Sequence, residues 1–194
     1  MNHPEIVQRC LVAMQENSSK TISVKIRLGI NDNDIDESLD DFIYQLSETG
    51  IKVFYVHARK AILDKLSPKD NRDIPPLNYA RVKNLKQDFP NLEIIINGGV
   101  KTTEEIKNHW TPVDGVLIGR DIYHSPYFLA DIEKEIFKNE NVPTRTEVME
   151  NLIPYIQEQT SKVVQLNHIM RHTVGLFHGQ NGSKIWKQYL SKNM

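Results

Sequence analysis

Four short apolar runs divide the first part of this chain into alternating segments. They cover residues 21–27, 53–56, 92–96 and 113–118, and their β-branched and aromatic side chains are typical of buried strands. Before and between these runs, apolar residues recur at the three- and four-residue spacing of amphipathic helices. Strands that alternate with helices usually form parallel βα units. The pattern therefore predicts an α/β fold with four parallel strands.

The second part of the chain has only helical patterns. We expect helices at residues 127–137 and 163–174, a further one opened by a capping box of Thr144 and Glu147, and a last one around residues 185–190. The sequence thus predicts two domains, residues 1–125 with the strands and residues 126–194 as a small all-α domain.

Composition indicates an ordinary globular chain of 194 residues, 39% apolar and 25% charged. No run approaches the roughly 18 apolar residues of a membrane span, and the N-terminus lacks a signal pattern, so we expect no membrane association and a cytoplasmic location. The only cysteine, Cys10, excludes an internal disulfide framework. It lies on the apolar stripe of the first helix, which predicts a core residue rather than a nucleophile.

The net charge of −1 does not by itself indicate a nucleic-acid partner, but the charges are unevenly distributed. After Glu158 no acidic residue occurs, whereas five cationic residues do: Lys162, Arg171, Lys184, Lys187 and Lys192. Such a basic tail is compatible with a phosphate-backbone partner and, equally, with a solvated helix surface.

The loop after the second strand, residues 57–79, is unusually long for a compact domain, and such loops are usually functional. It contains Lys60, Lys65, Lys69 and Arg72 around three prolines. We expect His57, at the strand end, to face a ligand and the cationic loop to meet a polyanion.

Polar groups and glycines follow all four predicted strands. They are Lys25, His57, Asn97-Gly98-Gly99 and Gly119-Arg120. In parallel α/β folds the carboxyl ends of the strands carry the chemistry, and glycine-rich turns with a cation suit a phosphate group. A phosphate-bearing cofactor is the functional interpretation. Plain turns at the glycines, an exposed edge residue at Lys25 and a structural histidine at His57 are the alternatives.

His168 and His172 have the spacing of a zinc-binding pair, but no third ligand is apparent. We therefore predict no metal site.

Five segments carry a resemblance to the tRNA-dihydrouridine synthase family, in particular to its bacterial A-type, which acts on D-loop uridines 20 and 20a. They are VKIRLGI (24–30), HARKAILDKLSPKDNRDIPPLNY (57–79), INGGV (96–100), DGVLIGR (114–120) and RHTVGLFHGQNGSKIWKQYLS (171–191). The resemblance implies an FMN-binding βα barrel followed by a helical tRNA-binding domain, and reduction of uridine driven by NADPH.

By matching position, the resemblance implies that Lys25 contacts the flavin ring and His57 the cofactor. It implies a phosphate site for FMN at Asn97, Gly98, Gly99, Gly119 and Arg120, and tRNA contacts at Lys69, Arg72, Lys184 and Lys187.

The family's barrel has eight strands, so the four predicted here are expected to be strands five to eight of an incomplete, half TIM-type barrel. The family's catalytic cysteine has no counterpart in this chain, because Cys10 lies in a different sequence context. We therefore expect a truncated chain that does not catalyse the reaction alone. The alternatives are an inactive RNA-binding remnant and a phosphate-binding βα-barrel isomerase or aldolase with Lys25 as a Schiff-base lysine.

Overall fold

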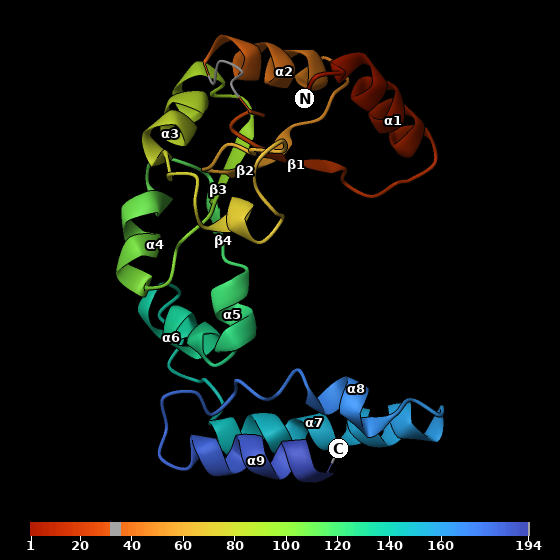
Figure 1. Ribbon diagram of the computed structural model, residues 1–194, viewed down its shortest axis with the longest axis vertical. Helices are drawn as coiled ribbons and strands as arrows, with labels where there is room; N and C mark the ends of the chain where they lie inside the picture. Colours follow the sequence, from red (N-terminus) through yellow and green to blue (C-terminus); the bar gives the residue numbers. More distant parts are fainter. Residues whose placement is uncertain (32–35, 194) are drawn as a thin grey trace. The chain divides into compact units, whose positions relative to one another are not determined.

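The predicted parallel sheet is present in the computed structural model, which describes residues 1–31 and 36–193. Its strands are β1 (Ser23–Arg27), β2 (Val53–His57), β3 (Glu93–Asn97) and β4 (Gly115–Leu117). They are hydrogen-bonded in the order β1-β2-β3-β4, and all three pairings are parallel (Figure 1). The α/β prediction is therefore confirmed, and the sheet is consistent with part of a TIM-type barrel.

Two compact units make up the chain. Unit 1 comprises residues 1–100 and 104–118, and unit 2 comprises residues 101–103 and 119–194. The predicted domain boundary at residue 125 stays a prediction.

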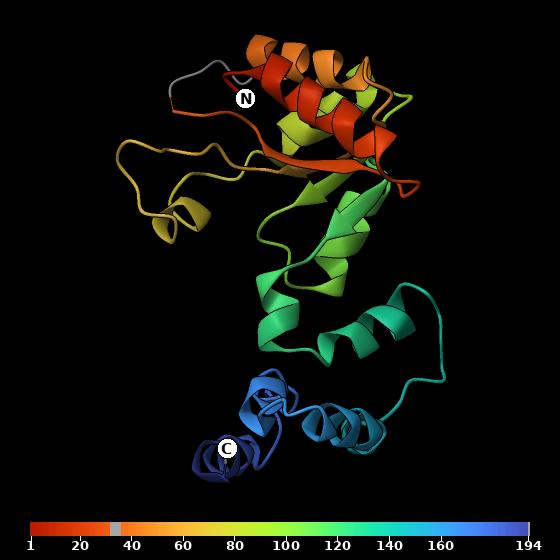
Figure 2. The ribbon, with the colours of Figure 1, turned by 90° about the vertical axis from the view of Figure 1, so that its right-hand side faces the viewer.

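Helices cover one face of the sheet in unit 1. They are α1 (Pro4–Glu16), α2 (Glu37–Ser47), α3 (Tyr79–Asp88) and α4 (Thr103–Trp110). The ribbon shows α1 and α2 packed beside the strands (Figures 1 and 2). The core joins these two helices through Leu11 and Phe42 to strand residues such as Phe54 and Ile94. Alternate strand positions, Phe54 with Val56 and Ile94 with Ile96, are fully buried because their side chains point toward this layer.

The other face of the sheet carries the half-buried and polar positions. Its register sets Lys25 beside Tyr55 and Ile95, and one pleat further on Arg27 beside His57 and Asn97. Paired residues in a parallel sheet point to the same side, so these side chains share one face. Of the predicted site residues, Lys25, His57 and Asn97 lie on this face, toward the carboxyl ends of the strands.

Unit 2 contains α5 (Arg120–His124), α6 (Phe128–Glu135), α7 (Arg145–Ser161), α8 (Leu166–Met170) and α9 (Ser183–Asn193). The predicted capping box is confirmed, because Thr144 accepts from the Glu147 amide and the Glu147 carboxylate accepts from the Thr144 amide. Arg145 lies 3.8 Å above the centre of the Tyr127 ring and donates to the Leu176 carbonyl. These contacts anchor the start of α7.

Two predictions in the helical segments are wrong. Cys10 is exposed, because α1 turns Val7 and Leu11 toward the sheet and leaves Cys10 and Met14 on the outer line of the helix. The helix expected at 163–174 is only the short α8: Val163 has a left-handed φ of 67°, which excludes it from the helix, and the residues after Met170 form turns.

Within the described ranges, no helix combines the length and the apolar character that a membrane crossing requires.

Candidate functional site

The centre of the candidate site is a hydrogen bond between the first and third strands. The Lys25 ammonium on β1 donates to Oδ1 of Asn97 at the end of β3, over 2.8 Å. Lys25 is exposed and lies on the edge strand β1, as the alternative of an exposed edge residue predicted, and its Nζ reaches across β2 to Asn97. Partial burial, and then the nearby charge of Arg27, lower the pKa of Lys25. The ammonium is thus held in a cationic surrounding.

Asn97 is bound at both ends of its side-chain amide. Its Oδ1 accepts from Lys25, and its Nδ2 donates to the Leu117 carbonyl of β4 over 2.9 Å. Only 8% of the residue is exposed. Its backbone carbonyl also accepts from the Ala58 amide, just after His57. Asn97 therefore ties the carboxyl ends of the strands together.

Gly98 and Gly99 form a turn that other residues would not fit. Their φ angles are +116° and +74°, values that side chains with a Cβ rarely adopt. A Cβ on Gly98 would lie 3.0 Å from Leu77 and 3.2 Å from Nε2 of His57. His57 therefore lies beside this turn, and the turn requires glycine at both positions.

Gly119 and Arg120 belong to unit 2, so their place beside Asn97 stays a prediction. Gly119 precedes α5 with an ordinary φ of −109°, and a Cβ there would meet no atom within 4 Å. Steric crowding within this chain therefore does not require glycine at position 119. Arg120 is exposed as the first residue of α5.

The long loop is ordered by buried contacts that the sequence pattern did not predict. Asn71, 7% exposed, accepts from the Ile62 amide and donates to the Ile62 and Leu66 carbonyls. Arg27 donates to the carbonyls of Lys60 and Asn71, at 2.9 and 2.7 Å. Because Lys25 and Arg27 alternate on one strand, the sequence could have indicated that Arg27 lies on the same face as Lys25. Nothing in the local sequence distinguishes Asn71 from the other polar residues of the loop.

The loop presents positive charge to solvent. Lys69 and Arg72 are exposed on either side of the buried Asn71, in and beside the short 3-10 helix η1 (Asp70–Arg72). Burial, and then the charges of Arg59 and Arg72, lower the pKa of Arg27. Cationic side chains thus occur both at the base of the loop and on its surface, and contact with a polyanion stays a prediction.

In unit 2, Lys184 and Lys187 are exposed on α9. Residues three apart on a helix are neighbours on its surface. The two ammonium groups therefore form a small cationic patch of their own.

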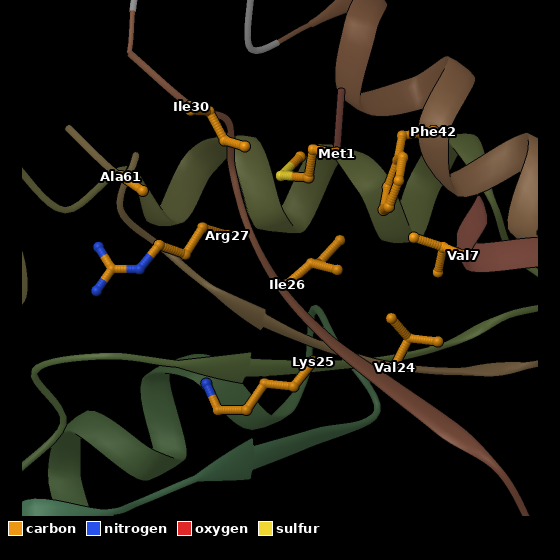
Figure 3. A pocket seen from close by; sticks show the side chains of 9 residues that line it. All are labelled: Met1, Val7, Val24, Lys25, Ile26, Arg27, Ile30, Phe42 and Ala61. Atoms are coloured by element: carbon orange, nitrogen blue, oxygen red, sulfur yellow. The ribbon is translucent and has the colours of Figure 1, made fainter. Parts of the chain in front are cut away.

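A pocket of about 540 Å³ opens along β1. Figure 3 shows Met1, Val7 and Phe42 on one side of this strand and Lys25 on the other. The volume lies in the range of about 300–1,000 Å³ found for small-molecule sites. Lys25 belongs to both this pocket and the hydrogen-bonded site at Asn97.

In the part of the chain that the structure describes, no group of three or more His, Cys, Asp or Glu side chains is arranged to hold a metal. Nδ1 of His172 lies 3.3 Å from the Tyr123 hydroxyl instead.

The sheet places this chain among parallel α/β proteins, a class in which ligands commonly bind at the carboxyl ends of the strands. Comparison with known proteins gives the particular family. Residues 1–194 match the family described as dihydrouridine synthase, and the chain belongs to that family.

Similar proteins include the tRNA-dihydrouridine(20/20a) synthases of Vibrio parahaemolyticus, 48% identical, Haemophilus ducreyi, 46% identical, and Shigella flexneri, 45% identical. Each match covers 100% of this chain and 58–60% of the relative. The chain thus spans about three fifths of the length of these relatives.

Proposed function

We propose that this chain carries cofactor- and tRNA-binding parts of a tRNA-dihydrouridine synthase, an oxidoreductase that reduces uridine to 5,6-dihydrouridine in the tRNA D-loop. The observation that carries the proposal is the hydrogen bond from Lys25 to Asn97 beside the Gly98–Gly99 turn. Membership of the family supports it. With a tRNA substrate, the proposed location is the cytoplasm.

In this proposal, β1 to β4 are strands five to eight of a βα barrel, within residues 1–125. The segment 126–194 is the helical domain that binds tRNA. The sheet order and the helices that follow β4 support both assignments.

The residues of the site fit FMN. A phosphate monoester prefers amide N–H groups and fixed cations. Gly98 and Gly99 keep the backbone free of side chains, and the buried Asn97 fixes the strand end from which their turn begins. We assign the FMN phosphate to Asn97, Gly98 and Gly99 together with Gly119 and Arg120. Lys25 is assigned to the flavin ring, and His57 to the cofactor.

FMN, when bound and reduced by NADPH, supplies the hydride for C6 of uracil. The residues of this chain bind the cofactor and orient it. Asn97 fixes the Lys25 ammonium at 2.8 Å, so a positive charge stands at a defined place on the ligand-facing side of the sheet. Cys10 is not the acid that protonates C5, because it lies on the outer line of α1, in the helix layer that covers the other face.

For tRNA we assign Lys69 and Arg72 on the loop and Lys184 and Lys187 on α9. The target base must leave its stack to be reduced, so the protein has to bind the tRNA backbone around this base. Contacts from Lys and Arg to phosphates supply affinity that falls with salt. The exposure of all four side chains supports this role.

Cofactor binding is tested by titrating the purified chain with FMN and with riboflavin, which lacks the phosphate, and following flavin fluorescence. We expect FMN to bind about 10- to 150-fold more tightly, the value of one charged hydrogen bond or ion contact. Lys25→Met should weaken both ligands. The control, Lys52→Met, removes an exposed lysine before the amino end of β2 and should weaken neither.

Equal affinity for the two flavins, or none, would overturn the proposed phosphate site. A chain that binds tRNA without flavin would instead support the RNA-binding remnant. The lowered pKa of Lys25 would also suit a Schiff-base aldolase. That alternative predicts that a phosphorylated aldehyde forms an imine with Lys25, which borohydride reduces to a stable adduct on this lysine.

The tRNA assignment is tested by the salt dependence of binding in a filter assay. Removing two phosphate contacts should reduce the slope of log K against log salt by roughly 1.4–1.8. We expect this change for the Lys69→Ala/Arg72→Ala pair and for the Lys184→Ala/Lys187→Ala pair. The control pair, Lys20→Ala/Lys52→Ala, should keep the original slope. Slopes that do not differ among the three pairs would remove the four residues from the interface.

A further inference from the structure

Tyr79 reaches from the start of α3 to the diglycine turn. Its hydroxyl donates to the Gly98 carbonyl over 2.7 Å, between residues 19 positions apart. It also lies 2.9 Å from the point where a Cβ of Gly99 would be, and Leu77 lies 2.7 Å from the same point. The turn is therefore pressed against two side chains of the segment that leads into α3.

This hydrogen bond determines which way the turn presents its amide groups. The peptide between Gly98 and Gly99 is trans, so its carbonyl and its N–H point in opposite directions. With the carbonyl on Tyr79, the Gly99 N–H points away from the tyrosine. Two successive glycines have a wide choice of backbone conformations, so the turn needs an external partner to keep one of them.

His109 of α4 supports the tyrosine from behind. The ring centroids of Tyr79 and His109 are 4.3 Å apart with the planes tilted by 50°, and only 8% of His109 is exposed. Burial, and then Glu105, raise the pKa of Tyr79, so its hydroxyl keeps the proton that it donates. Burial, and then Lys83, lower the pKa of His109, so the supporting ring is neutral.

We propose that Tyr79 is a positioning residue for ligand binding, which holds the Gly98 carbonyl so that the Gly99 amide is presented to the phosphate of the bound cofactor. The inference rests on the proposed function, because it takes FMN as the ligand of this turn. Tyr79 itself contacts the turn and not the ligand. Its role is to select one backbone conformation, with His109 keeping the ring in place.

The test compares FMN and riboflavin affinity in the full chain carrying Tyr79→Phe. This change removes the hydroxyl and keeps the ring beside His109. We expect FMN affinity to fall about three- to tenfold, the size of one hydrogen bond, and riboflavin affinity to stay unchanged. A purely structural role would weaken both flavins alike. The matched control is Tyr127→Phe, which also deletes a hydroxyl donor to a backbone carbonyl, that of Pro143 in unit 2.

The outcomes separate the two proposals. If the unaltered chain does not prefer FMN, the proposed phosphate site fails and this inference fails with it. If the unaltered chain prefers FMN and Tyr79→Phe keeps the full preference, only the role of Tyr79 is overturned.

A second measurement needs no variant. Selective labelling with [15N]glycine gives signals from the nine glycines of the chain. The Gly99 amide should shift with FMN and not with riboflavin. A Gly99 signal that responds equally to both ligands would overturn the inference, even if Tyr79→Phe did not fold.

Discussion

Replacing Gly99 by alanine should destabilise unit 1 by about 2–5 kcal/mol. At a φ of +74°, the left-handed backbone costs an alanine about 1–2 kcal/mol. The new methyl group would also lie 2.7 Å from Cδ1 of Leu77 and 2.9 Å from the Tyr79 hydroxyl oxygen. Displacing two packed side chains in this way costs about 1–3 kcal/mol. The two effects act on the same turn and together give the expected range.

Tryptophan fluorescence in urea measures this loss, because the two tryptophans lie in different units. Trp110 ends α4 in unit 1, and Trp186 lies in α9 of unit 2. In a Trp186→Phe background, Trp110 therefore reports on unit 1 alone. Linear extrapolation of the transition to zero urea yields the free energy of unfolding.

Gly50→Ala is the control in the same unit. Gly50 has a similar φ of +88°, but its Cβ would meet only Nε2 of Gln15, at 3.7 Å. This variant should lose only the backbone contribution of about 1–2 kcal/mol. Equal losses for Gly50→Ala and Gly99→Ala would refute the reasoning, since they would mean that Tyr79 and Leu77 do not press on the turn.

Three further predictions concern buried polar groups of unit 1. Arg81 is 4% exposed and pairs with Asp36 and Asp40. Measured by thermal melts, Asp40→Asn should reduce the free energy of unfolding by about 1–3 kcal/mol. Asp36→Asn, at the more exposed carboxylate, should reduce it by less than about 1 kcal/mol. Equal reductions would contradict this ranking. Because folding lowers the pKa of His109, this histidine takes up a proton at a higher pH in the unfolded chain than in the folded one. The free energy of unfolding should therefore decrease as the pH falls below 6.5. His109→Gln should flatten this part of the plot of stability against pH. An unchanged profile would exclude a contribution from His109. Asn71→Ala removes the contacts that order the long loop, so trypsin should cleave it faster while α3 remains protected; unchanged cleavage would contradict this.

Local patterning predicts the sheet well, for a physical reason. A strand such as Val53–His57 alternates between a buried and a half-buried face, and that period is present in the sequence itself. The strand ends then follow from the fold class, so Lys25, His57 and Asn97 could be expected near one another. Their hydrogen bond depends on a register that periodicity does not specify.

Contacts between distant segments could not be predicted in this way. Tyr79 looks like the first residue of a helix, and its bond to Gly98 appears only when α3 has packed beside β3. Asn71 and His109 are equally ordinary in sequence and become informative only through burial. In unit 2, apolar spacing predicted a helix from residue 163, and it did not indicate that Val163 has a left-handed backbone.

The strand order has a consequence for how the sheet forms. Within the described sheet, each of β1, β2 and β3 pairs with the strand that follows it in the chain. A polypeptide leaves the ribosome from its N-terminus, and domains with contacts between successive elements fold faster than those with distant ones. The sheet is therefore suited to growing one βα unit at a time during synthesis, with each finished strand serving as the template for the next.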